Sequence, residues 1–117
     1  MEKTNAVAAL AALAQDNRLD VFRLLVEAGP EGMPAGAVAG ALKLAPNTLT
    51  FHFDRLRDAG LVTVRRDGRS MIYAARFETM NDLLAFLTEN CCQGARASCA
   101  PAECKPAKAA RKRERVS

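Results

Sequence analysis

The sequence predicts a mainly α-helical domain with one small β-hairpin, in the order α-α-α-α-β-β-α. Apolar residues recur at helical spacing in five segments, which indicates five helices. Glycine and proline separate the segments at residues 29–30, 46 and 60, where helices are expected to end or begin. Before the last segment, Asp67-Gly68 joins two short strand-like runs, as in a two-residue hairpin.

The first two predicted helices lie in residues 6–28. In the first helix, Val7, Leu10 and Leu13 form an apolar stripe among alanines. Asp16 or Asn17 is expected to cap the second helix. That helix is apolar nearly all round, so we expect it to be central; its apolar residues are Leu19, Val21, Phe22, Leu24, Leu25 and Val26.

A short third helix is predicted with Pro34 in its first turn, followed by a fourth helix over about residues 46–59. Leu49, Phe53 and Leu56 recur at i, i+4 and i+7, and Ala59 lies one turn further on, so they predict the buried stripe of the fourth helix. The opposite face is expected to carry short polar and basic side chains, namely Asn47, Thr48, Thr50, His52 and Arg55.

Residues 61–66 and 69–74 are predicted to pair as the hairpin, and a fifth helix is predicted to run to about residue 90. Beyond it the chain is rich in Ala, Pro and Lys and has too few large apolar residues to fold alone. We therefore expect residues 1–92 to form one domain and residues 93–117 to form a flexible, cysteine-containing, basic tail.

The net charge of +4 is unevenly distributed. Residues 105–117 carry six Lys or Arg and one acid, so the rest of the chain has a net charge of −1. The basic tail is weak evidence for nucleic acid, although it would add non-specific DNA affinity. No apolar run approaches the ~20 residues of a membrane span, and a domain this small favours a dimer.

The predicted elements include a short helix, a turn, a polar-faced helix and a basic hairpin, in this order. This order predicts a winged helix-turn-helix that binds double-stranded DNA. The fourth helix has one apolar side to hold it on the body and one side of short polar residues that suits the major groove. Arg65, Arg66 and Arg69 surround the hairpin tip and suit phosphate or minor-groove contacts.

The chain resembles the ArsR/SmtB family of metal-responsive repressors over about residues 4–92. The resemblance lies in residues 46–62, which read PNTLTFHFDRLRDAGLV, and continues through the basic hairpin to Tyr73. It implies a homodimer joined through the first and last helices, which represses a promoter until a ligand binds. The family often has Ser-Gln before the proline and a His-His pair in the recognition helix, where this chain has Leu44-Ala45 and Phe51-His52.

Neither familiar effector site of the family is present. Residues 33–38, where the best-known arsenic site has its cysteines, contain no cysteine. The zinc site on the last helix needs paired Asp and His, but the single histidine, His52, lies on the predicted recognition helix.

The four cysteines, Cys91, Cys92, Cys99 and Cys104, are the remaining soft ligands. Trivalent arsenic or antimony takes three thiolates, and soft ligands select soft centres. Cys91 and Cys92 can supply two sulfurs, and the loop from Gln93 to Ser98 can bring Cys99 back. The pattern also resembles a subgroup of the family with a Cys-Cys pair after the last helix and another Cys several residues on. We therefore predict an arsenic(III) effector site at Cys91, Cys92 and Cys99, with Cys104 as an alternate ligand.

Other readings of the cysteines stay open. A methylated trivalent arsenical would need only two thiolates. Another soft metal, or zinc held by all four cysteines, would use the same residues, although adjacent cysteines are awkward for a tetrahedral site. Arg96 could stabilise a thiolate in a redox switch. The cysteines could also be incidental.

Catalysis is not expected, because the only imidazole lies on the DNA-reading helix and no base accompanies a nucleophilic cysteine. We expect no organic cofactor and no membrane partner. Clustered thiols without a signal peptide favour a cytoplasmic protein, where thiols stay reduced. A plain DNA-binding or metal-sequestering protein without switching is the alternative class.

Overall fold

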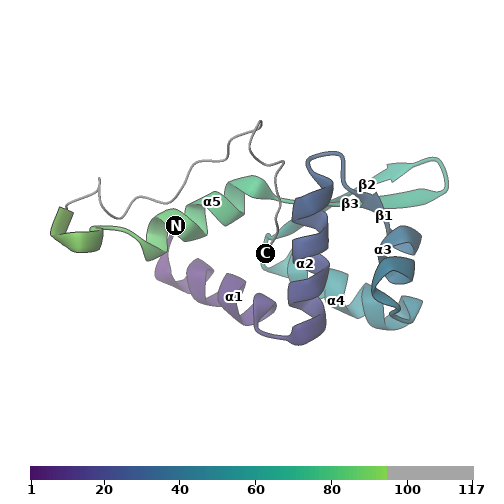
Figure 1. The fold of residues 1–117 in the computed structure, drawn as a ribbon, viewed down its shortest axis with the longest axis horizontal. Coiled ribbons are helices and arrows are strands. Elements are labelled where there is room, and N and C mark those ends of the chain that lie inside the picture. Colours follow the sequence, from purple (N-terminus) through teal and green to yellow (C-terminus); the bar gives the residue numbers. More distant parts are fainter. Residues whose placement is uncertain (95–117) are drawn as a thin grey trace, which may run out of the picture. The chain divides into compact units, whose positions relative to one another are not determined.

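The computed structural model describes residues 1–94 and confirms the predicted fold class. The chain divides into two units, Met1–Leu87 and Thr88–Ser117. None of the helices in residues 1–94 has the length and apolar content needed to cross a membrane. The elements, drawn in Figure 1, are α1 (Lys3–Leu13), α2 (Asp16–Ala28), β1 (Met33–Pro34), α3 (Ala35–Leu42), α4 (Pro46–Asp58), β2 (Val62–Asp67), β3 (Ser70–Ala75), α5 (Phe77–Leu87) and the short 3-10 helix η1 (Cys91–Gly94).

Helix α2 is central in the first unit, as predicted, and contacts α1, α3, α4 and β3. Its Val21 and Leu25 are fully buried. The side chain of Gln15 caps this helix by accepting a hydrogen bond from the backbone N–H of Arg18 at 2.9 Å. The expectation that Asp16 or Asn17 is the cap was therefore wrong, since both lie inside the helix.

Helix α1 packs on the body through alanines, Ala6, Ala9 and Ala12, which are at most 8% exposed. Small side chains let two helices approach closely, so the alanine face turns inward. The larger apolar residues of the same helix, Val7 and Leu10, are 58% and 42% exposed. Of the apolar stripe predicted for this helix, Val7 and Leu10 therefore lie at the surface of the single chain, whereas Leu13 is partly buried against the core.

The sheet has three strands in the order β1-β3-β2, all antiparallel. Strand β1 was not predicted: Met33 pairs with Tyr73, and Pro34, expected in a helix, pairs with Ile72 and precedes α3. Gly32 permits this pairing because its φ is +76° and a Cβ there would collide with the Tyr73 carbonyl oxygen.

Helix α4 is fixed to the body by a buried stripe. Leu49, Phe53 and Leu56 are at most 2% exposed, as predicted. The ring of Phe53 stacks on the ring of Tyr73 in β3, with centroids 3.6 Å apart and an interplanar angle of 4°. This contact joins α4 directly to the middle of the sheet.

The structure corrects the placement of His52, which was expected on the outer face of α4. His52 is only 5% exposed and continues the buried stripe, because residues 49, 52, 53 and 56 share one helical face. Neither ring nitrogen has a hydrogen-bond partner among the described residues. Burial lowers the pKa of His52 below its ordinary value of 6.5, and the positive charge of Arg18 lowers it further.

Replacing His52 tests this environment through the dependence of stability on pH. Because the folded pKa is lowered, the unfolded chain binds more protons, so stability falls as the pH drops below 6.5 towards the folded pKa. His52→Leu removes two unpaired buried nitrogens and should raise the free energy of unfolding by about 1 kcal/mol at neutral pH.

The advantage of His52→Leu over the wild type should grow between pH ~7 and pH ~5. Urea denaturation across this pH range measures the difference in free energy of unfolding between the two proteins. The carboxylates titrate in both proteins alike, so their contributions cancel in this difference. A difference that stays constant with pH, or a destabilised variant, would contradict the buried neutral imidazole.

Candidate nucleic-acid interface

Helices α3 and α4 pack against each other and form the helix-turn-helix. The turn between them begins at Lys43, whose φ of 56° places it in the left-handed conformation, and the backbone N–H of Leu44 donates to the carbonyl of Ala39 at 3.0 Å. Pro46 then starts α4, where its fixed φ suits the first helical turn. The turn thus sets the direction in which α4 leaves the turn. The buried stripe of α4 sets the rotation of this helix about its own axis.

The outer face of α4 carries most of the side chains predicted to read DNA. Asn47, Thr48, Thr50 and Arg55 are all exposed. The Thr50 hydroxyl donates to the Pro46 carbonyl at 3.0 Å, so it offers only its oxygen lone pairs to a base. Asn47 and Thr48 have both donors and acceptors to offer in the first turn of the helix.

Phe51 also lies on this outer face, and the sequence reasoning missed it. It is 50% exposed, and the guanidinium of Arg55 lies over its ring, 5.0 Å from the centroid. This cation–π contact fixes the direction of Arg55. The spacing of residues 49, 53 and 56 could have indicated that residue 51 faces away from the core.

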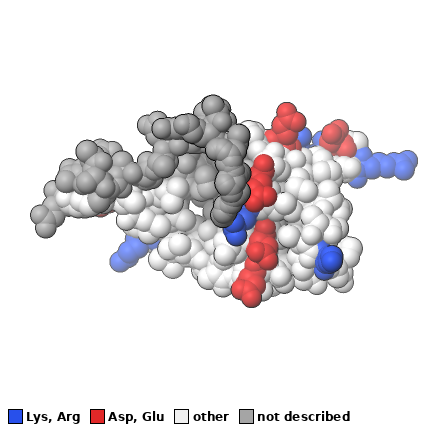
Figure 2. Space-filling model, viewed as in Figure 1, with Lys and Arg blue, Asp and Glu red and all other residues white. Residues whose placement is uncertain are grey.

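The hairpin of β2 and β3 projects beyond the helices as the wing (Figure 1). Arg65, Arg66 and Arg69 are exposed around its tip, where Asp67 pairs with Ser70. Figure 2 shows basic side chains projecting from this end of the molecule. Arg66 donates from Nε to the Gly68 carbonyl at 3.3 Å, which leaves its terminal nitrogens for another acceptor.

Two apolar surfaces lie on α1 and α5, which contact each other. Val7 and Leu10 of α1 are exposed, and so are Leu84 and Leu87 of α5, at 45% and 54%. We refer to these four exposed apolar residues on two contacting helices as the apolar patch.

Of the four predicted effector ligands, the structure describes two. Cys91 is a partly buried free thiol, and Cys92 is exposed with a φ of 54°. Both lie in η1 of the second unit. Cys99 and Cys104 lie outside the described residues. Within residues 1–94, no three His, Cys, Asp or Glu side chains come together as a metal site.

A model of the helix-turn-helix domain matches residues 13–65 of this chain. The chain is 30% identical over 87 residues to the HTH-type transcriptional regulator YgaV of Escherichia coli (strain K12), covering 74% of this chain and 86% of that protein.

Among solved structures, an ArsR-like transcriptional regulator from Rhodococcus sp. RHA1 matches with a TM-score of 0.68 and 22% identity, covering 81% of this chain and 87% of that one. The homodimeric winged helix-turn-helix DNA-binding domain of Mb0332 from Mycobacterium bovis matches with a TM-score of 0.61 and 23% identity, covering 80% and 84%.

These matches confirm the prediction of a DNA-binding transcriptional regulator. The chain belongs to the helix-turn-helix transcriptional regulators, and it has the winged-helix fold seen in ArsR-like regulators.

Proposed function

We propose that this protein is an arsenic(III)-responsive transcriptional repressor of the cytoplasm. It binds operator DNA as a homodimer and leaves the DNA when trivalent arsenic or antimony binds Cys91, Cys92 and Cys99. The observation that carries the effector is the pair of adjacent cysteines directly after the last helix of a winged helix-turn-helix.

The DNA half of the proposal is supported by the outer face of α4 and by the wing. Side chains that suit base edges lie on α4, and unpaired guanidiniums lie on the hairpin, so one surface combines base contacts with phosphate contacts. Asp54, an exposed acidic residue of α4, has an ion pair with Arg57 at 3.8 Å, which reduces its repulsion of phosphates.

The homodimer is supported by the apolar patch on α1 and α5. A second copy packed on these helices would remove their most exposed large apolar side chains from water. These side chains are Val7, Leu10, Leu84 and Leu87. The resemblance to the ArsR/SmtB family implies the same two helices, and Mb0332, which shares the fold, is described as homodimeric. A dimer would present two copies of α4 to half-sites about one DNA turn apart.

The effector half rests on the chemistry of the donors. Trivalent arsenic takes soft thiolates, and the free thiol of Cys91 lies beside Cys92 in η1. The chain continues from α5 to these cysteines within a few residues, so a ligand that draws Cys99 onto them acts next to a dimer-forming helix. An effector that binds the DNA-free form better must weaken DNA binding by the same factor.

Three substitutions on α4 test its contacts with the operator. Asn47→Ala, Thr48→Ala and Arg55→Ala should each cost about 1–3 kcal/mol in operator binding, because each removes a polar group from the outer face. Fluorescence anisotropy on labelled operator measures the loss, and circular dichroism checks the fold. Arg23→Ala removes an exposed charge from α2 and serves as the matched control. Wild-type affinity in all three variants would show that α4 does not enter the major groove of the operator.

Neutralising the wing tests its phosphate contacts. Arg65→Gln, Arg66→Gln and Arg69→Gln should weaken binding to specific and unrelated DNA alike. Each lost contact should reduce the slope of log K against log salt by about 0.9. Arg76→Gln is the control, since Arg76 lies outside the hairpin and pairs with Glu78 at 3.5 Å. An unchanged slope in the triple variant would mean that the hairpin does not touch DNA.

Serine replacements test the cysteine site on the reduced protein. Cys91→Ser, Cys92→Ser and Cys99→Ser should each abolish tight arsenite binding in calorimetry while operator affinity stays unchanged, because a hydroxyl does not replace a thiolate for a soft centre. Cys104→Ser should matter less. Retention of arsenite binding by all three single variants would exclude this site. If only Cys91 and Cys92 are needed, a methylated arsenical becomes the better effector.

A further inference from the structure

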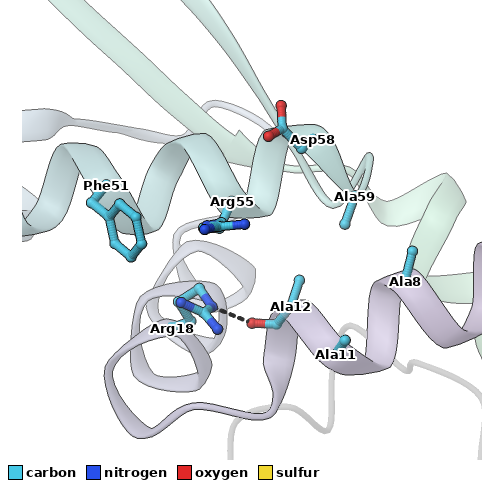
Figure 3. A pocket seen from close by; sticks show the side chains of 8 residues that line it. All are labelled: Ala8, Ala11, Ala12, Arg18, Phe51, Arg55, Asp58 and Ala59. Carbon is cyan, nitrogen blue, oxygen red and sulfur yellow. Dashed lines mark hydrogen bonds between the residues drawn. The ribbon is translucent and has the colours of Figure 1, made fainter.

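A pocket of about 450 Å³ lies between the α1–α2 corner and α4, within the first unit (Figure 3). One wall is apolar and consists of Ala8, Ala11 and Ala12 of α1. The other walls contain the guanidiniums of Arg18 and Arg55 and the ring of Phe51. Its volume is within the range of small-molecule sites, about 300–1,000 Å³.

The two guanidiniums share the pocket without a counter-ion. Among the described residues neither Arg18 nor Arg55 has an ion pair. Asp58 also lines the pocket, but Figure 3 shows its carboxylate pointing away from both guanidiniums. Two like charges that face one partly enclosed space repel each other, and an anion between them would relieve that repulsion.

Both arginines are already oriented for a ligand. Arg18 donates from Nε to the Ala12 carbonyl at 2.6 Å, and its terminal nitrogens have no hydrogen-bond partner among the described residues. Arg55 is held over the Phe51 ring at 5.0 Å. Side chains that are fixed before binding lose less conformational entropy when a ligand arrives.

The buried His52 can serve as a probe of the charge on Arg18. The positive charge of Arg18 contributes to the lowered pKa of His52, so the field of the guanidinium reaches the buried imidazole. An anion bound to Arg18 would weaken this field. Because His52 is the single histidine of the chain, its ring signal is an internal probe of the pocket.

We propose that this pocket binds a small aromatic carboxylate, with the carboxylate between Arg18 and Arg55 and the ring against Phe51 and the alanines of α1. Guanidinium pairs suit a carboxylate, whereas the phenyl and methyl groups suit a flat apolar body. The pocket is thus a second effector site, separate from the cysteines. Its effect on DNA rests on the function proposed above: the ligand engages Arg55 and so lowers operator affinity.

Benzoate is the probe, and binding is measured first without DNA. Calorimetry on the wild type should give saturable binding of one benzoate per chain, and NMR should show that the pKa of His52 rises at saturation. Benzamide, which has the same shape without the charge, should bind at least about tenfold more weakly. Inorganic phosphate, which lacks the apolar body, should also bind more weakly.

Variants assign the binding to the pocket. Arg18→Gln and Arg55→Gln should each weaken benzoate binding about tenfold or more. Ala11→Leu should abolish binding by filling the space while it leaves both charges in place. Arg57→Gln, on the same helix but outside the pocket, should bind like the wild type.

Three results would overturn the site: no saturable benzoate binding up to about 10 mM, wild-type binding by Arg18→Gln and Ala11→Leu together, or benzamide or phosphate binding as tightly as benzoate. The effect on DNA has its own measurement. Benzoate should weaken operator binding by the wild type and not by Ala11→Leu. Equal weakening in both proteins would overturn the competition, whereas failure to bind the operator at all would count against the proposed function alone.

Discussion

The rest of the structure depends on the contact between one buried face of α4 and the sheet. Phe53 stacks on Tyr73, and Tyr73 in turn pairs with Met33 of β1 and Val64 of β2. The Phe53–Tyr73 stack therefore links α4 to the strands of the wing, beside the direct packing of α4 on β2. Because the interior is close-packed, neither element can shift without disturbing the other. This rigidity would let the outer face of α4 and the wing act together on DNA, as the proposed function requires.

The same buried face decides which side chains of α4 are available. With Leu49, His52, Phe53 and Leu56 turned inward, the side chains left outside divide into two groups. Asn47 and Thr48 face outward in the first turn, where bases would be read. Phe51 and Arg55 lie further along, against the pocket that includes Arg18. In the proposed function and the further inference, Arg55 belongs to both groups, so a ligand in the pocket would compete with DNA for this one side chain.

Much of this fold could be predicted from the sequence, because helical spacing and hairpin signals are local. The predictions were wrong where tertiary packing, rather than local sequence, determines the conformation or burial of a residue. His52 was assigned to the outer face because it is polar, although its spacing places it in the buried stripe. Strand β1 has two residues and no periodicity, so only its pairing with β3 reveals it. In α1 one face of alanines is buried while Val7 and Leu10 are exposed, since the closest helix packing needs the smallest side chains. The cysteine site rests on ligand chemistry and on the resemblance to a family subgroup, and it stays a prediction because Cys99 and Cys104 lie outside the described residues.

In the proposed function, thiol chemistry after the last helix controls whether α4 and the wing stay on DNA. The most direct test follows labelled operator by anisotropy while arsenite is added to the reduced wild-type protein, with zinc and a thiol oxidant as parallel titrations. We expect arsenite to release the DNA at about stoichiometric concentration and a chelating dithiol to restore binding. Operator that stays bound through a large excess of arsenite would contradict it, and release by zinc or by the oxidant alone would assign the switch to a different chemistry.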